Sequence, residues 1–125
     1  MKNIIDEINS VASTFMYLEF AVVSYKAENL IVAGSQDFLY YQNFEIEFEN
    51  VFSIIGNLRW KANTKKAVLT ICGLIEAHEL NRKYRVEQGN TIFKFVDEDN
   101  IDIFFIARNI KFRNEVVKFD KSVIN

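Results

Sequence analysis

The segment that most constrains this chain is residues 44–49, where apolar and acidic side chains alternate without exception. The order is Phe-Glu-Ile-Glu-Phe-Glu, so every second side chain is apolar. Neighbouring side chains of a β-strand point to opposite faces of the sheet, and the pattern therefore predicts a strand with one buried and one solvated face. Such a sheet is typically antiparallel, because parallel sheets are covered on both faces.

The first eighteen residues follow a different period. Ile4, Ile8, Val11, Phe15 and Leu18 recur at steps of three and four residues, and polar residues fill the opposite side. This spacing places one apolar stripe along a helix. A helix with one apolar stripe must cover another apolar surface. We therefore expect an N-terminal helix packed on the sheet.

Short segments separated by turn residues make up most of the remaining chain. They are rich in β-branched and aromatic residues, which fit a pleated, half-buried surface. The expected strands are residues 20–25, 30–33, 38–41, 44–55, 58–60, 84–87, 91–96, 101–107, 110–112 and 116–119. Asn50 breaks the alternation of its strand and is interpreted as a bulge. A tight turn at Gly89-Asn90 is expected to join 84–87 to 91–96 as a hairpin, with Phe93 and Phe95 in the core.

Residues 64–80 fit two structures. A helix would place five side chains of this segment on one face. These are Val68, Ile71, Leu74, Ile75 and His78. Residues 68–72 also suit a strand, and Gly73 weakens a helix interior by about 0.5–1 kcal/mol relative to Ala. The helix is the preferred prediction.

These elements combine into one domain that spans residues 1–125. Half of the residues are hydrophobic, which is ample for a core, and proline is absent, so there is no Pro-rich linker. The predicted fold class is α+β. An N-terminal helix packs on a strongly curved, mostly antiparallel sheet that can close toward a barrel, with a second helix near 64–80.

Charge and cysteine content restrict the partners and the compartment. The net charge is −2, whereas nucleic-acid binders carry a basic footprint. The single cysteine cannot form an internal disulfide, which argues against a small secreted scaffold. Asp6 and Glu7 stand where a signal peptide needs an apolar run, and no apolar stretch is long enough to span a bilayer. We expect a cytoplasmic protein that binds neither nucleic acid nor membrane.

The usual catalytic and metal sites lack the residues that they need. His78 and Cys72 are the only histidine and cysteine, whereas a zinc site needs three or four ligands and a Cys–His nucleophile needs a third, orienting group. The acidic turn at 97–99 is followed by Ile101 and Asp102, where a calcium loop requires an oxygen ligand and a glycine. The sequence therefore predicts a non-catalytic protein without metal or cofactor.

Two groups of residues are candidates for a partner-binding surface. The glutamates of the alternating strand form an acidic stripe that would attract a basic partner. Tyr, Trp and Arg are enriched at interface hot spots. The candidates are Glu45, Glu47, Glu49, Tyr40, Tyr41, Arg59 and Trp60. Each has a structural alternative as well: the stripe can be solvated and opposed by lysines of a neighbouring strand, and a lone Trp commonly packs in the core.

Two functions from different classes fit these features. The first is a non-catalytic protein-binding module, in concrete form an immunity-type inhibitor of a bacterial toxin with a basic surface. Small, acidic, motif-free α+β domains resemble such inhibitors as a class, without a shared motif. The second is a carrier of small apolar ligands, with a cavity inside the curved sheet. A carrier requires an apolar cavity of a few hundred Å³, whereas an inhibitor requires a filled core and a patterned exterior.

Overall fold

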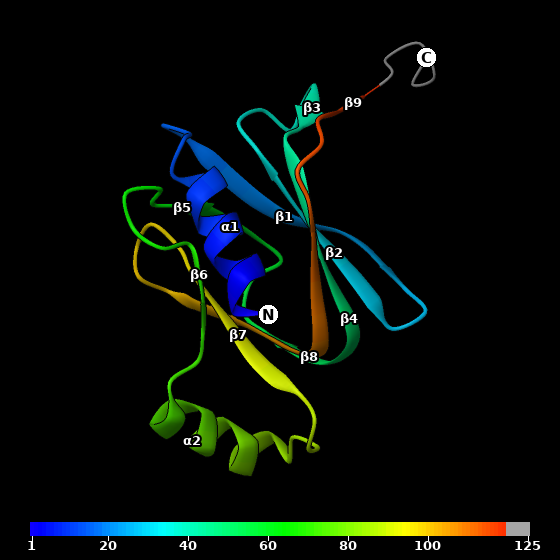
Figure 1. The fold of residues 1–125 in the computed structure, drawn as a ribbon, viewed down its shortest axis with the longest axis vertical. Helices are drawn as coiled ribbons and strands as arrows, with labels where there is room; N and C mark the ends of the chain where they lie inside the picture. The colour runs from blue at the N-terminus through cyan, green and yellow to red at the C-terminus, as the bar shows by residue number, and fades with distance from the viewer. Residues whose placement is uncertain (120–125) are drawn as a thin grey trace.

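The computed structural model describes residues 1–119 and places two helices against one curled antiparallel sheet (Figure 1). The elements in chain order are α1 Lys2–Ala12, β1 Leu18–Lys26, β2 Asn29–Ser35, β3 Tyr41–Gln42, β4 Phe44–Ile55, β5 Arg59–Ala62, β6 Leu69–Ile71, α2 Leu74–Tyr84, β7 Thr91–Val96, β8 Asp102–Arg113 and β9 Val117–Lys118. Seven strands form the main sheet in the order β5-β1-β2-β4-β8-β7-β6, and β3 pairs with β9 in a separate ribbon. The predicted α+β class with a curved antiparallel sheet is confirmed.

The curl of the sheet follows from long strands that contain irregularities. β4 and β8 are twelve residues each and pair along most of their length. Their register shifts between Val51 and Ser53, directly after Asn50, whose φ is +52°. β1 shifts against β2 between Val22 and Ser24. Such bulges bend a strand and increase its twist. The irregularity predicted at Asn50 is therefore present and helps to curl the sheet.

The concave face of the sheet is filled with aromatic side chains. Phe48 stacks on Phe105, with ring centroids 4.9 Å apart, and Trp60 contacts Phe95 at the same separation. Phe93 and Phe95 are fully buried, as the alternation of their strand predicted. α1 covers this layer through Ile5, Ile8 and Ala12, as expected for an N-terminal helix with an apolar stripe. The helix ends at Ala12, so Phe15 and Leu18 of the predicted stripe lie beyond it, and Leu18 is the first residue of β1.

One side chain of α1 also holds the edge strand β6. Asn9 Nδ2 donates to the carbonyl of Leu69 at 2.8 Å. Asn9 Oδ1 accepts hydrogen bonds from the amides of Val68 at 2.8 Å and Leu69 at 3.1 Å. The helix is therefore joined to the sheet edge by directional bonds as well as by apolar packing.

The second helix lies further along the chain than predicted. Residues 69–71 form β6, which pairs Leu69 with Phe95 and Ile71 with Phe93. Gly73 then has an extended backbone (φ −65°, ψ 158°) and serves as the N-cap of α2. Pairing with the core strand β7 outweighs the helical spacing of residues 64–72, because it buries Leu69 completely.

The predicted hairpin at Gly89-Asn90 is wrong. Tyr84 is the last residue of α2 rather than part of a strand, and the turn joins that helix to β7. β6 occupies the place beside β7 that residues 84–87 were expected to take. The predicted strand at 38–41 is also shorter: Asp37 accepts hydrogen bonds from the amides of Tyr40 and Tyr41, which makes a turn before β3.

Candidate functional site

The three glutamates of the predicted acidic stripe lie on the outer face of β4, where β8 supplies their counter-charges. Arg113 Nη2 is 3.0 Å from Glu45 Oε2, and Arg113 Nη1 is 2.8 Å from Glu47 Oε1. Lys111 Nζ is 3.0 Å from Glu49 Oε2. The pKa of Arg113 is raised, first by its hydrogen bond to Glu47 and then by that to Glu45. The stripe is thus largely neutralised within the sheet, and a basic partner would compete with Arg113 and Lys111 for it.

The predicted pair Arg59 and Trp60 separates between the two faces of the sheet. Trp60 is 4% exposed and stacks on Phe20 in the core. It is therefore a packed core residue, the alternative given for it above, and not part of a binding surface. Arg59 lies on the outer face, pairs with Glu19 and stands 5.1 Å above the ring of Phe38. The alternation of β5 explains this separation, because adjacent residues of a strand face opposite sides.

The structure brings only part of the predicted set together. The paired positions run Arg59, Ala21, Ala33, Glu45, Arg113 across five strands, so Arg59 and Glu45 lie on one face, three strand spacings or about 14 Å apart. Tyr40 is 45% exposed at the turn before β3. Tyr41 is half-buried and pairs with Lys118 of β9. The predicted residues therefore form a broad outer face rather than a compact site.

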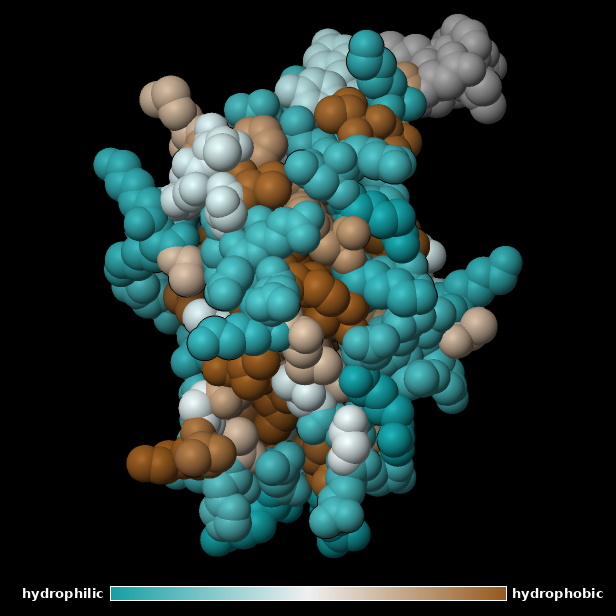
Figure 2. All heavy atoms as spheres, in the orientation of Figure 1, coloured by the Kyte–Doolittle hydropathy of each residue, from teal (hydrophilic) through white to brown (hydrophobic). Residues whose placement is uncertain are grey.

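A cluster of exposed aliphatic residues was not predicted as a site. Leu74 is 91% exposed, Ile75 is 82% exposed and Ile71, just before them, is 45% exposed. We call these three residues the apolar corner. Figure 2 shows hydrophobic side chains that project from the surface over the N-terminal end of α2. The sequence analysis placed them on one face of a predicted helix over 64–80, and only the break at Gly73 could have indicated that the helix starts there and leaves them exposed.

The apolar corner continues into a groove between α1 and β6. The groove has a volume of about 360 Å³ and is lined by Lys2, Ile5, Asp6, Asn9, Leu69 and Ile71, among others. The Cys72 amide donates a hydrogen bond to the Ile92 carbonyl. Because the bonding side alternates along an antiparallel strand, the even-numbered residues of β6 and Cys72 point their backbone N–H and C=O groups toward β7. Ile71 therefore directs its backbone groups away from β7, toward the open edge. The groove therefore offers both apolar side chains and the free backbone groups of a strand edge.

Cys72 lies under α2, beside Glu76 and Lys94, and its burial there suppresses its reactivity. Its Sγ is 3.3 Å from Glu76 Oε1, which also accepts a hydrogen bond from Lys94 Nζ at 2.9 Å. Burial, and then the hydrogen bond to Glu76, raise the pKa of Cys72 to about 11. The thiolate is the nucleophilic form, so this thiol is unreactive near neutral pH. His78, its candidate catalytic partner, is exposed on α2.

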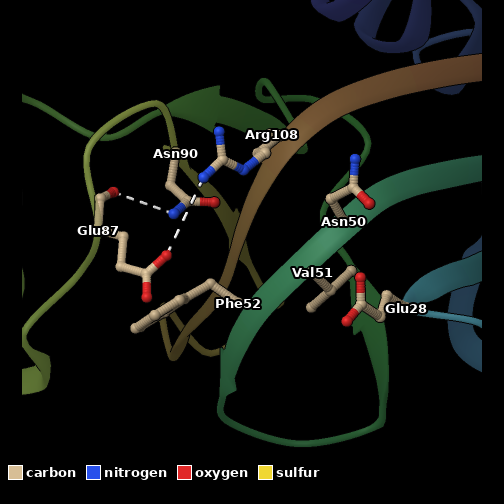
Figure 3. A pocket seen from close by; sticks show the side chains of 7 residues that line it. All are labelled: Glu28, Asn50, Val51, Phe52, Glu87, Asn90 and Arg108. Atoms are coloured by element: carbon tan, nitrogen blue, oxygen red, sulfur yellow. Dashed lines mark hydrogen bonds and ion pairs between the residues drawn. The ribbon is translucent and has the colours of Figure 1, made fainter.

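A polar cavity of about 350 Å³ lies beside the loop that joins the C-terminal end of α2 to β7 (Figure 3). Its lining residues are Glu28, Asn50, Val51, Phe52, Glu87, Asn90 and Arg108. They come from the turn between β1 and β2, from the irregular part of β4, from the loop before β7 and from β8. Arg108 Nη2 is 4.0 Å from Glu87 Oε2, and Asn90 Nδ2 donates to the Glu87 carbonyl at 3.0 Å.

Comparisons with known proteins leave these surfaces as the basis for function. No known family matches the chain, and no curated protein or solved structure is similar to it. Within residues 1–119, no group of three or more His, Cys, Asp or Glu side chains is arranged to hold a metal ion. Neither α1 nor α2 has the length and apolar character needed to cross a membrane.

Proposed function

We propose that this chain is a non-catalytic protein-binding module that contacts its partner through the apolar corner. The observation that carries the proposal is the exposure of Leu74 and Ile75, which are adjacent and both more than four-fifths exposed. A contiguous exposed aliphatic cluster typically marks an interaction site, whereas singly exposed residues are ordinary. Burying a Leu or Ile side chain contributes about 1.5–3 kcal/mol, so a partner that covers the corner gains substantially.

The filled core supports a binding module over a ligand carrier. A carrier needs its cavity on the concave side of the sheet. In the described residues that side is occupied by α1 and by stacked rings such as Phe48 on Phe105. The exterior, by contrast, is patterned with an ion-paired face, an apolar corner and an open strand edge.

The concrete form that we propose is an immunity-type inhibitor of a bacterial toxin with a basic surface. The stripe residues Glu45, Glu47 and Glu49 face two cations, Arg113 and Lys111, which leaves one excess negative charge among these five side chains. A basic partner would be guided by such a field and then held by apolar contact at the corner.

Affinity capture with matched variants tests the proposal. The tagged protein, the double variant Leu74→Ser/Ile75→Ser and the control Leu39→Ser are compared, because Leu39 is also exposed but lies outside the corner. We expect a partner that the wild type and the control retain and the double variant loses. Co-expression should then protect cells from that partner's toxicity. A captured partner that the double variant binds equally well would contradict the role of the corner.

A further inference from the structure

We propose that the polar cavity binds a primary ammonium or a guanidinium group. This site is separate from the apolar corner and does not depend on the proposed protein-binding function. The cavity has a fixed wall, a buried acceptor without a hydrogen-bond partner and an excess of negative charge.

The wall of the cavity is fixed by backbone conformation. Glu28, Asn50 and Gly89 all have left-handed φ angles, of +67°, +52° and +92°. The Val51 amide donates to the Glu28 carbonyl at 2.8 Å, and the Asn50 amide donates to Asn29 Oδ1 at 3.2 Å. Three segments far apart in sequence thus converge around one cavity. Non-glycine residues in this conformation persist where the surrounding structure determines them, often at functional positions.

Asn90 presents an acceptor that the protein leaves unsatisfied. Its Nδ2 donates to the Glu87 carbonyl, which fixes the orientation of the amide. Its Oδ1 is buried and has no hydrogen-bond partner among the described residues. Figure 3 shows this oxygen directed away from Glu87, toward the side where Asn50 and Glu28 lie. Buried polar atoms are nearly always paired, so this oxygen lacks a hydrogen-bond donor, which a ligand N–H can supply.

The charges of the cavity also favour a cation. Glu28 and Glu87 contribute two carboxylates against the single guanidinium of Arg108. Arg108 lies at the Glu87 end, 4.0 Å from that carboxylate, and its Nη1 would be 2.9 Å from a Cβ built on Gly89. Within residues 1–119 the Glu28 carboxylate has no counter-ion. An anion here would face two carboxylates, whereas a cation would neutralise the unpaired one.

Phe52 supplies the apolar part of the site. Its side chain is 38% exposed and lies between Glu87 and Glu28 in Figure 3. An aromatic ring attracts a cation at its face and also packs against an alkyl stem. A volume of about 350 Å³ accommodates an alkylammonium or alkylguanidinium group of the size of a Lys or Arg side chain.

Titration with agmatine, which carries both cationic groups, tests this proposal by calorimetry and by amide chemical shifts. We expect saturable binding that shifts the amides of Asn50 and Asn90, with little response to 1-butanol as the neutral control. Glu28→Gln should weaken binding about threefold to tenfold, and Arg108→Gln should strengthen it by a similar factor, because the first removes an attractive charge and the second a repulsive one. Glu98→Gln, far from the cavity, should leave the affinity unchanged.

The outcomes separate the ligand classes. Tighter binding of a short peptide with one Arg than of agmatine would identify a protein side chain as the natural source, and the reverse would identify a free amine. No saturable agmatine binding, equal binding of 1-butanol, or weaker agmatine binding by Arg108→Gln would overturn the proposal. Thermal melts of each variant establish that the fold is retained.

Discussion

The two helices within residues 1–119 have the same length and opposite relations to the sheet. α1 and α2 are eleven residues each. α1 buries Ile5, Ile8 and Ala12 on the concave face and binds the edge strand through Asn9. α2 has no fully buried residue and turns Leu74 and Ile75 into solvent.

This comparison shows that apolar content and structural role are different properties of a helix. α2 rests on a second, smaller cluster through Ala77 and Leu80, which are only partly buried. Glu76 attaches it further, through the ion pair with Lys94 and the hydrogen bond from Cys72. α1 is therefore a part of the core, whereas α2 is an appendage that displays apolar side chains.

The largest expected loss of stability comes from removing a buried side chain of α1. Ile8 is fully buried, and Ile8→Ala should lower the free energy of unfolding by about 2–5 kcal/mol, because it leaves a cavity under the helix. Ile75→Ala is the matched control on α2 and should change it by less than about 0.5 kcal/mol. Urea denaturation of both variants measures the difference. Equal losses would mean that α2 is also part of the core.

A second prediction concerns the bonds from α1 to β6. Asn9→Ala removes three hydrogen bonds and leaves backbone groups of Val68 and Leu69 without their partner. The expected loss is about 1–3 kcal/mol, which is the cost of unpaired buried polar groups. Ser10→Ala, on the exposed side of the same helix, is the control for helix propensity. A loss no larger than that of the control would show that water replaces the asparagine.

A third prediction uses pH to probe the cluster under α2. The raised pKa of Cys72, about 11 against an ordinary 9.0, means that the folded protein favours the neutral thiol. Its contribution to stability is complete below pH 9 and is lost as pH rises from 9 to 11. The thermal midpoint of the wild type should therefore fall more steeply across this window than that of Cys72→Ala. Parallel curves for the two proteins would contradict the assigned environment.

A smaller effect is expected from the ion pair that attaches α2. Lys94→Met removes the contacts of Lys94 with Glu76 and, at 3.7 Å, with Asp102. These groups are partly exposed, so the global stability should fall by only about 0.2–1 kcal/mol. Hydrogen exchange should nevertheless accelerate at the α2 amides of Ala77 and Leu80 and remain unchanged in α1. Acceleration in both helices would show that they unfold together.

The smallest expected change in stability comes from the exposed residues of α2. The double variant Leu74→Ser/Ile75→Ser should leave the free energy of unfolding within about 0.5 kcal/mol of the wild type, because nothing in the described fold covers these side chains. Denaturation combined with sedimentation would reveal whether the corner joins two copies of the chain. A clear loss of stability in a monomeric sample would mean that the corner has a structural role.

Sequence patterns predicted the parts of the fold in which local period and tertiary packing agree. The alternation of residues 44–49 identified the central strand, and Phe93 and Phe95 were correctly placed in the core. The stripe that begins at Ile4 identified α1, although the helix ends at Ala12 and does not reach Leu18. The largest errors lie at residues 64–87, where a helical spacing of apolar residues continued across a segment that forms a strand. The pairing of Leu69 with Phe95 decided that segment, and no local pattern encodes a partner so distant in sequence.

The candidate surfaces were harder to predict, because they depend on which face of an element meets solvent. The glutamates of β4 were correctly assigned to an outer face, but the cations that neutralise them, Arg113 and Lys111, come from a strand more than sixty residues later. Leu74 and Ile75 were placed only on one face of a predicted helix, and their exposure was not predicted. The polar cavity joins four separate segments and has no sequence signature.

The position of Asn9 also bears on how this protein behaves when it is crowded. A curled open sheet ends in two edges, and exposed strand edges can recruit other chains into fibrils. At the β6 edge, the side chain of Asn9 hydrogen-bonds the backbone N–H and C=O of Leu69. At the β5 edge, the Glu98 amide donates to the Lys61 carbonyl at 2.8 Å. Each bond fills a place that an incoming strand would need. The outward backbone groups of Ile71 and Arg59 are left as short open stretches. A helix and a turn therefore shield part of each edge from an incoming strand without closing the sheet into a barrel.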